Sequence, residues 1–281
     1  MHKSRLPLFA LVLLSLVVQS CSTKVDQTEH HITKKELKVY EKKEEASNLD
    51  CYFLDDIDAP YIKLESLKNY RMETQFAKGF PIADYTYSYS NGVLKAEQTY
   101  NEQNYSIEFD AYKDEIRSEK LIHALDIFHF GSPRDLCSAD YSPIVKATVN
   151  EEDINTEKAV TFSLRDYDID LYAYDNSVLI PFAIVNSLFF FSGEKVFSYN
   201  GKAIFESGNC YSSFAPYNSY TTEEKNRDRN QNTAVFNRNE FMFELNTYFG
   251  RKDDSVIHDF RDYAKYLGVY ENLASTAPLT A

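Results

Sequence analysis

Tryptophan is absent from the 281-residue sequence, and glycine and proline occur only eight times each. So few glycines exclude collagen-like repeats and the glycine-rich loops that cradle phosphate groups. The missing tryptophan argues against a platform for stacking sugars, because tryptophan has the largest flat amphipathic ring. Basic residues are also scarce, since 30 Lys and Arg stand against 43 Asp and Glu, a net charge of −13. An acidic surface argues against nucleic acid as a partner.

The beginning of the chain has the design of an export signal. Lys3 and Arg5 precede an apolar run of 13 residues, 6–18, which is shorter than the about 20 residues that a membrane-spanning helix needs. The run leads into Val18-Gln19-Ser20-Cys21. This ending resembles the lipobox of bacterial lipoproteins, in which the chain is cut before a cysteine that is then acylated.

The lipobox resemblance implies a signal peptide over residues 1–20 and a lipid anchor on Cys21, at a membrane of a bacterial cell envelope. Ser22 resembles the residues of outer-membrane-sorted lipoproteins, which lack Asp at that place. Loss of residues 1–20 removes two bases and no acid, so the net charge changes from −13 to −15. We therefore expect attachment to rest on the acyl chains alone. The alternative is ordinary secretion, with Cys21 as a plain thiol.

Three further cysteines remain: Cys51, Cys137 and Cys210. Disulfides persist in exported proteins, so one bridge and one buried or reactive thiol is the simplest account. We expect the bridge to join Cys137 and Cys210, because both lie in the predicted folded body. None of the three has the CxxC spacing of a redox or zinc site.

The domain boundaries follow from composition. Residues 21–50 are dense in Lys and Glu and predict a flexible polar tether, in which a capping box at Thr33 allows a short helix to about Glu45. A single folded domain is expected over residues 51–273, and residues 274–281 are expected to form a disordered tail.

Alternation of polar and apolar residues predicts most of the strands. Asn91-Gly92 between two alternating runs predicts a two-residue hairpin, and Asn200-Gly201 predicts a second one. Helices and a long polar loop separate and follow the strands, which indicates an α+β domain with an antiparallel sheet. The predicted strands are 70–76, 84–90, 93–100, 105–112 and 161–174, and the second hairpin spans 196–206. The predicted helices are 114–130, 240–249 and 254–267, and the mobile loop is 221–233.

The most apolar stretch of the mature chain runs from Val178 to Phe191. Its 14 residues are too few for a bilayer span. It predicts either a helix that is apolar all round, and so buried on every side, or two buried strands that turn at Asn186-Ser187. A second hypothesis is that the end of this stretch lines a hollow for an apolar ligand. The candidate lining residues are Leu188, Phe189, Phe190 and Phe191.

Patterns for catalysis or metal binding are weak. The Asp166–Asp170 stretch lacks the Gly and Glu of an EF-hand, and strand alternation puts its aspartates on a solvated face. His123 and His129 are spaced so that a regular helix would not bring them to one ion. A Gly-x-Ser-x-Gly nucleophile motif is missing. We therefore assign no catalytic residue, metal or cofactor, and leave open whether the protein is an enzyme.

Two short segments resemble the lipoprotein-carrier and mycobacterial lipid-binding half-barrel families. Lys68-Asn69-Tyr70-Arg71-Met72-Glu73-Thr74 is similar to their first strand, and Gly193-Glu194-Lys195-Val196-Phe197-Ser198-Tyr199-Asn200-Gly201 is similar to a later strand with an Asn-Gly-type turn. The two segments together make up 16 of the 281 residues. It implies a curved antiparallel sheet, in the form of a half-barrel, with helices packed on one side and acyl chains held in the hollow.

These observations predict a lipid-anchored envelope protein that binds an apolar ligand or another envelope component. The expected partners are the membrane, through the anchor, and a lipid or an envelope protein. The alternative is a structural or interaction lipoprotein whose outer Tyr-rich strands meet a protein, and an envelope hydrolase comes third. A lined apolar hollow favours ligand binding, whereas a closed and packed core favours the interaction protein.

Overall fold

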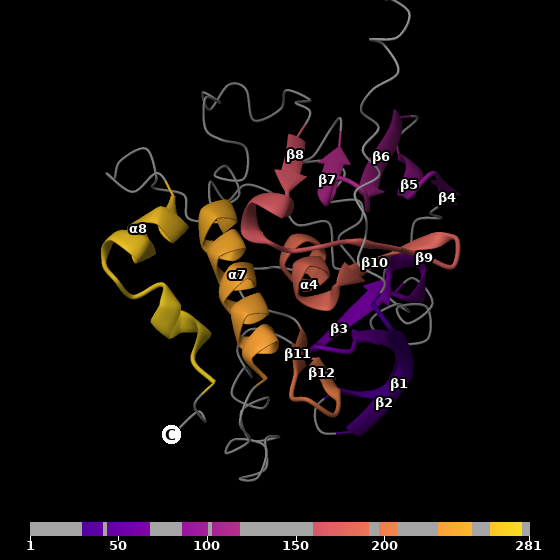
Figure 1. The fold of residues 1–281 in the computed structure, drawn as a ribbon. Coiled ribbons are helices and arrows are strands. Elements are labelled where there is room, and N and C mark those ends of the chain that lie inside the picture. The colour runs from indigo at the N-terminus through magenta and orange to yellow at the C-terminus, as the bar shows by residue number, and fades with distance from the viewer. Residues whose placement is uncertain are drawn as a thin grey trace, which may run out of the picture.

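The structure is a computed structural model in which the described residues form an α+β fold with a seven-stranded and a five-stranded sheet (Figure 1). The predicted class, an antiparallel curved sheet with helices on one side, is confirmed. The described residues are 30–41, 44–67, 86–100, 103–118, 160–190, 197–206, 230–248 and 259–276.

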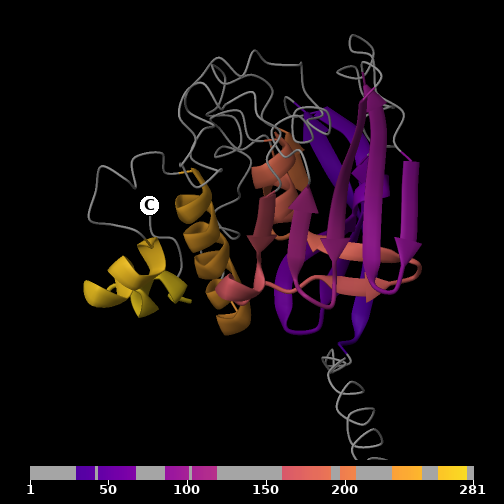
Figure 2. The same cartoon turned by 90° about the horizontal axis from the view of Figure 1, so that it is seen from above.

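The seven-stranded sheet has the order β11-β12-β1-β2-β3-β10-β9, and its neighbours are antiparallel except for the parallel pair of β1 and β12. The five-stranded sheet is an antiparallel meander in the order β4-β5-β6-β7-β8. Figure 2 shows the β9–β10 hairpin running crosswise to the meander strands. The strands of the first sheet are β1 (Ile32–Glu41), β2 (Glu44–Leu54), β3 (Ile57–Lys63), β9 (Tyr172–Tyr174), β10 (Ser177–Pro181), β11 (Phe197–Tyr199) and β12 (Ile204–Glu206). Those of the second are β4 (Thr86–Ser90), β5 (Val93–Tyr100), β6 (Gln103–Asp110), β7 (Glu115–Ser118) and β8 (Val160–Ser163).

The long β1–β2 hairpin corrects the predicted boundary of the domain. Residues 32–54 form these two strands, so the prediction of a tether over 21–50, with a helix from Thr33 to Glu45, is wrong beyond residue 31. The folded body already includes Ile32 and does not begin at Cys51. Residues 1–29, with the predicted signal peptide, lie outside the described part of the chain.

The physical reason for the β1–β2 hairpin is an alternation of apolar and charged residues, which the high overall content of Lys and Glu conceals. Leu37 and Val39 face the core, and Leu37 pairs with the buried Leu49 of β2. The alternate positions of β1 carry the charged and exposed Lys34, Glu36 and Lys38. Among them, Lys34 Nζ pairs with Asp50 Oδ2 of β2 at 2.7 Å. A strand with one apolar face needs only every second residue to be apolar, so a few apolar points suffice here.

The predicted meander is confirmed in β4, β5 and β6. Asn91 and Gly92 have φ of 50° and 76°, as a two-residue hairpin turn requires, and the ring of Tyr112 lies directly over Gly92. Tyr87 and Tyr89 pack against the core, whereas the residues between them are exposed. The expected tyrosine-rich outer face is therefore wrong for β4, because the tyrosines occupy the inward positions of the pleat.

Two other predictions are corrected by the strands that follow. The predicted helix 114–130 is wrong at residues 115–118, which form β7 with Ile116 buried between β6 and β8, and residues 119–130 lie outside the described part. The predicted strand 161–174 is interrupted by a 3₁₀-helix, η4 (Arg165–Tyr167), and by Asp168 at φ 53°. The predicted strand 70–76 also lies outside the described residues.

The apolar stretch from Val178 is a short strand followed by a buried helix, and the alternative of two strands that turn at Asn186-Ser187 is wrong because both residues lie within the helix. Strand β10 continues directly into helix α4 (Phe182–Phe190), and Ile180, Ile184 and Val185 are completely buried. The prediction that this stretch is core is confirmed for its described side chains. The β11–β12 hairpin is also confirmed, but its loop has four residues, 200–203, closed by the Asn200 side chain.

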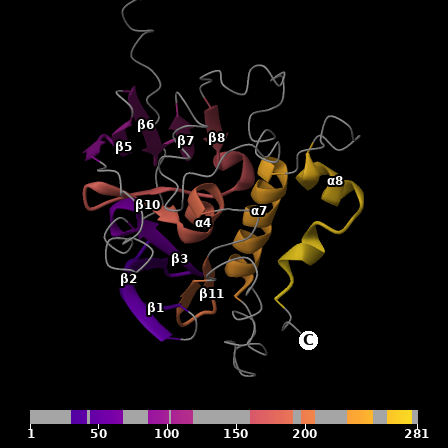
Figure 3. The ribbon, with the colours of Figure 1, turned by 180° about the vertical axis from the view of Figure 1, so that it is seen from behind.

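Helix α7 (Gln231–Tyr248) begins nine residues before the predicted start at Glu240, so the predicted loop 221–233 is wrong at its end. Helix α8 (Phe260–Tyr266) and the 3₁₀-helix η5 (Glu271–Ala274) follow it. Ala274 is buried, so the predicted tail does not start there. Figures 1 and 3 show α4 between the sheets and α7, with α8 outermost. No helix of the described residues has both the length and the apolarity to cross a membrane.

Candidate functional site

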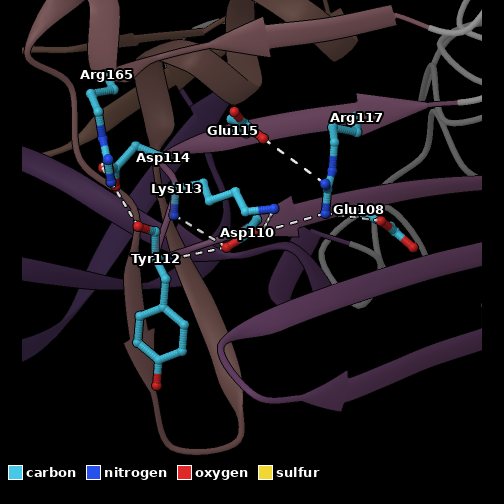
Figure 4. A network of polar contacts seen from close by, with 8 residues as sticks. All are labelled: Glu108, Asp110, Tyr112, Lys113, Asp114, Glu115, Arg117 and Arg165. Atoms are coloured by element: carbon cyan, nitrogen blue, oxygen red, sulfur yellow. Dashed lines mark hydrogen bonds and ion pairs between the residues drawn. The ribbon is translucent and has the colours of Figure 1, made fainter. Parts of the chain in front are cut away.

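Polar side chains gather at the β6–β7 turn, where they connect the two sheets (Figure 4). Asp114, at φ 54°, accepts the Leu171 N–H on Oδ1 at 3.0 Å. Its Oδ2 accepts from Arg165 Nη2 and Nε at 3.1 and 3.2 Å, and Arg165 Nη2 also donates to the Tyr112 carbonyl at 2.7 Å. Because Leu171 leads into β9, this carboxylate holds the meander against the seven-stranded sheet.

The electrostatics of Asp114 agree with a structural role. Burial raises the pKa of its carboxyl group above the ordinary value, although the bonds from Leu171 and Arg165 act in the opposite direction. A raised carboxyl pKa is also a mark of catalytic acids. Here, however, both oxygens are already engaged by the protein, so we interpret Asp114 as a brace between the sheets.

Asp110 is the second buried carboxylate of this turn. Its Oδ1 accepts the N–H groups of Tyr112 and Lys113 at 3.1 and 3.2 Å, which fixes the first half of the turn. Its Oδ2 lies 3.4 Å from Arg117 Nη2, and that guanidinium also reaches Glu108 Oε2 at 3.3 Å. These contacts therefore stabilise the β6–β7 turn itself.

A cluster of aromatic rings lies toward the β9 edge of the seven-stranded sheet and includes Tyr61 of β3 and Tyr172 of β9. The ring of Tyr172 lies edge-on to Tyr61 and to His30, and the Tyr172 hydroxyl donates to Asp170 Oδ2 at 3.2 Å. Burial raises the phenol pKa of both Tyr61 and Tyr172, so both stay protonated at neutral pH. At the edge of the cluster Lys63 Nζ pairs with Asp175 at 2.8 Å.

Buried polar groups also join α4 to its neighbours. The Asn186 side chain bonds both the N–H and the carbonyl of Phe197, at 3.1 and 2.9 Å, and thereby docks β11 on α4. The fully buried Ser187 hydroxyl donates to Glu244 of α7. This hydroxyl is a contact between two helices, because its position in the core leaves no route for a substrate.

Most of the residues that the sequence suggested for a ligand site, the anchor or a disulfide lie in the core or outside the described part of the chain. Leu188 is 4% exposed and belongs to the main core, while the side chains of Phe189 and Phe190, and all of Phe191, lie outside the described part of the chain. Cys21, Cys137 and Cys210 lie outside it as well. Cys51 is a buried free thiol, and burial raises its pKa to about 12. The described residues contain no group of three or more His, Cys, Asp or Glu side chains placed to hold a metal ion.

The C-terminal segment, residues 259–276, is attached to α7 by a small set of specific contacts. Arg238 of α7 donates to Glu271 Oε2 at 3.0 Å, and its guanidinium lies 4.0 Å from the ring centre of Tyr270. Arg238 and the Tyr270 hydroxyl both bond the Asn239 side chain. A second, small apolar cluster of Met242, Ala264 and Tyr270 lies beneath the segment.

Five large apolar side chains of this segment are exposed, together with the charged side chains of Asp262, Lys265 and Glu271. Tyr263, Tyr266 and Leu267 share one side of α8, because residues three and four apart are neighbours on a helix. Val269 and Leu273 are joined by a helical turn, through the Leu273 N–H and the Val269 carbonyl at 3.3 Å. We call these side chains the outer face of the C-terminal segment. It comprises Tyr263 (38% exposed), Tyr266 (85%), Leu267 (51%), Val269 (41%) and Leu273 (41%).

No protein-family model, curated protein or solved structure matches this chain. The function must therefore be argued from the site itself. Contiguous exposed apolar side chains mark surfaces that bind a partner or a membrane. The outer face is thus the candidate functional site, since the polar clusters above are each engaged within the fold. The sequence predicts a helix over 254–267 but does not indicate that its apolar side chains are exposed, because the same periodicity results whether an apolar side turns inward or outward.

Proposed function

We propose that this protein is a lipid-anchored protein of the bacterial cell envelope, and that it binds an apolar surface of the envelope through the outer face of its C-terminal segment. The observation that supports the binding role is the exposure of five large apolar side chains on one short segment. The support for the anchor is the basic start, short apolar run and Cys21 of the leader.

The position of β1 supports a function close to the membrane. The first described strand begins at Ile32, so ten residues, 22–31, separate it from Cys21. The eleven Cα–Cα steps from Cys21 to Ile32 span at most roughly 40 Å when fully extended. A body held by an acyl anchor on Cys21 would therefore remain within about one domain diameter of the lipid, so its partner must lie at or near that membrane.

The alternative, an apolar ligand carried inside the domain, has weaker support. Leu188 is the one proposed lining residue whose side chain is described, and it lies in the core. Native mass spectrometry of the unlipidated Cys21→Ala protein distinguishes the two. A copurified lipid of fixed stoichiometry would favour the carrier, whereas the bare protein mass is expected for surface binding.

The anchor is tested by replacing Cys21 with alanine. The Cys21→Ala protein should lose acylation and leave the membrane fraction, because an acidic body offers no strong second attachment to anionic lipid. Cys51→Ala is the matched control and should remain acylated and membrane-bound. Continued membrane fractionation of Cys21→Ala, together with no acyl label on the wild type, would contradict the proposed function.

A further inference from the structure

We infer that the occupant of the outer face of the C-terminal segment is the lipid bilayer itself, whose interfacial region takes up these apolar side chains. This inference rests on the proposed lipid anchor and specifies the surface that the anchored domain contacts. Three observations support it: the charge of the segment, its position relative to the N-terminal end of the fold, and the chemistry of its side chains.

The C-terminal segment carries little net charge. Residues 259–276 contain two bases, Arg261 and Lys265, and three acids, Asp259, Asp262 and Glu271, so their net charge is −1. Glu271 is moreover paired with Arg238. Anionic lipid repels an acidic body, and the repulsion is smallest where the protein surface is neutral.

A series of contacts places the end of the segment near the N-terminal end of the fold. His30, just before β1, lies 4.0 Å from Asp56 Oδ1, and Asp56 Oδ2 accepts from Asn232 Nδ2 at 3.1 Å. The neighbouring Gln231 donates to the Ala274 carbonyl at 3.5 Å. His30 and the end of η5 therefore both lie near the N-terminal end of α7, so an anchor joined to β1 by ten residues allows the end of the segment to meet the same bilayer.

The side chains suit the boundary between acyl chains and head groups. Tyrosine is enriched at that depth because its ring is apolar and its hydroxyl is polar. Leu267 and Leu273 supply apolar surface, and the long Lys265 side chain can keep its ammonium group in the head-group layer. So small a face binds lipid weakly by itself, but an anchor raises its effective concentration at the membrane. This agrees with the expected release of the Cys21→Ala protein.

The absence of tryptophan makes a direct test straightforward. Tyr266→Trp, at the most exposed position of the face, introduces a unique fluorophore into the lipidated full-length chain. Vesicles of phosphatidylethanolamine and phosphatidylglycerol are prepared with and without brominated acyl chains, which quench tryptophan at close range. For a face buried about 5–10 Å into the interface, we expect roughly a twofold or larger loss of emission in brominated vesicles.

Tyr112→Trp provides the matched control. Tyr112 is also exposed, but it lies over Gly92 in the β4–β5 turn, which Figure 2 places on the opposite side of the molecule from α8. Its emission should be the same in both kinds of vesicle. Equal quenching of the two variants would overturn the inference, because the domain would then have no preferred face.

Flotation of the same samples separates this inference from the proposed function. Protein that floats with the vesicles while the Tyr266→Trp emission is unchanged would contradict the bilayer contact and leave a protein or a second copy of the chain as the occupant. Protein that does not float at all would contradict the lipid anchor. Val269→Asp with Leu273→Asp, in the Tyr266→Trp background, is expected to abolish the quenching without preventing flotation.

Discussion

Helices α4 and α7 are both buried, yet they reach this state by opposite means. The first, α4, is apolar on nearly every side, so burial of its apolar side chains against the sheets is enough to stabilise it. The second, α7, has polar residues around most of its circumference. Its buried polar side chains are Thr233, Arg238, Asn239, Glu240, Asn246 and Thr247. Burial of such side chains is favourable only when specific hydrogen bonds replace those to water.

This difference shows how the domain is layered. One side of α7 belongs to the main core through Phe236 and Phe243. Its other side is covered by the C-terminal segment, through Arg238 and the small apolar cluster. A terminal segment with one exposed side opens locally at a lower free-energy cost than the core does. The core and the outer layer should therefore respond independently to mutation.

The largest effect is expected in the part of α7 that resembles α4. The ring of Phe243 contacts Phe162 and Tyr167, at centroid distances of 6.1 and 5.5 Å. Phe243→Ala should lower the free energy of unfolding by about 3–5 kcal/mol, because it leaves a cavity in the core. Phe241→Ala, on the exposed side of the same helix, should change it by less than about 0.5 kcal/mol. Denaturant midpoints measure both, and equal losses would contradict the assignment of the two sides of α7.

A smaller and local effect is expected from the polar side of α7. Arg238→Met removes the pair with Glu271 and the bonds to Asn239 but keeps much of the apolar stem. Amide exchange in residues 260–274 should accelerate by about tenfold, equivalent to about 1.4 kcal/mol, while α4 is unaffected. Glu271→Gln is the control and should have little effect, because its side chain is 84% exposed. Faster exchange in both regions of the Arg238→Met protein would mean that the two layers unfold together.

The smallest effect on stability is expected at Asp114, whose carboxylate connects the two sheets. Asp114 has a raised pKa in the folded protein, so the folded state binds its proton more tightly than the unfolded state does. Its contribution to stability is complete below the ordinary carboxyl pKa of about 3.9 and is lost as the pH rises through the raised value. Relative to Asp114→Asn, the wild type should thus lose stability across this window. Unfolding curves at several pH values test this, and a difference that does not vary with pH would contradict it.

The elements predicted correctly are those whose signals are local. Asn91-Gly92 specifies its hairpin through the positive φ of both residues. The run after Val178 is too apolar to lie at the surface of the protein, and its described side chains are mostly buried. The β1–β2 hairpin was missed, since the charged Lys34, Glu36 and Lys38 alternate with the few apolar residues of β1 and conceal Leu37 and Val39. Its partner β3 follows directly in the chain, but its other partner, β12, comes from residues 204–206, and no local pattern reveals that pairing.

The candidate site was less predictable than the fold, for a related reason. Apolar residues at helical spacing in 254–267 indicate a helix with one apolar side, which sequence analysis takes to face the core. Whether it does depends on what covers α7, and that depends on the contacts of Tyr270 with Arg238 and Asn239. Contacts between residues so far apart in the chain have no signature in the sequence.

Hydrogen exchange tests the central claim, that the outer face of the C-terminal segment is the binding surface, most directly. The lipidated full chain on vesicles is compared with the unlipidated Cys21→Ala protein in solution. We predict that amides in residues 263–273 exchange about tenfold or more slowly on the vesicles, because lipid contact suppresses opening of the segment, while those of α4 are unchanged. Unchanged exchange in residues 263–273, with protection gained elsewhere on the surface, would contradict the claim.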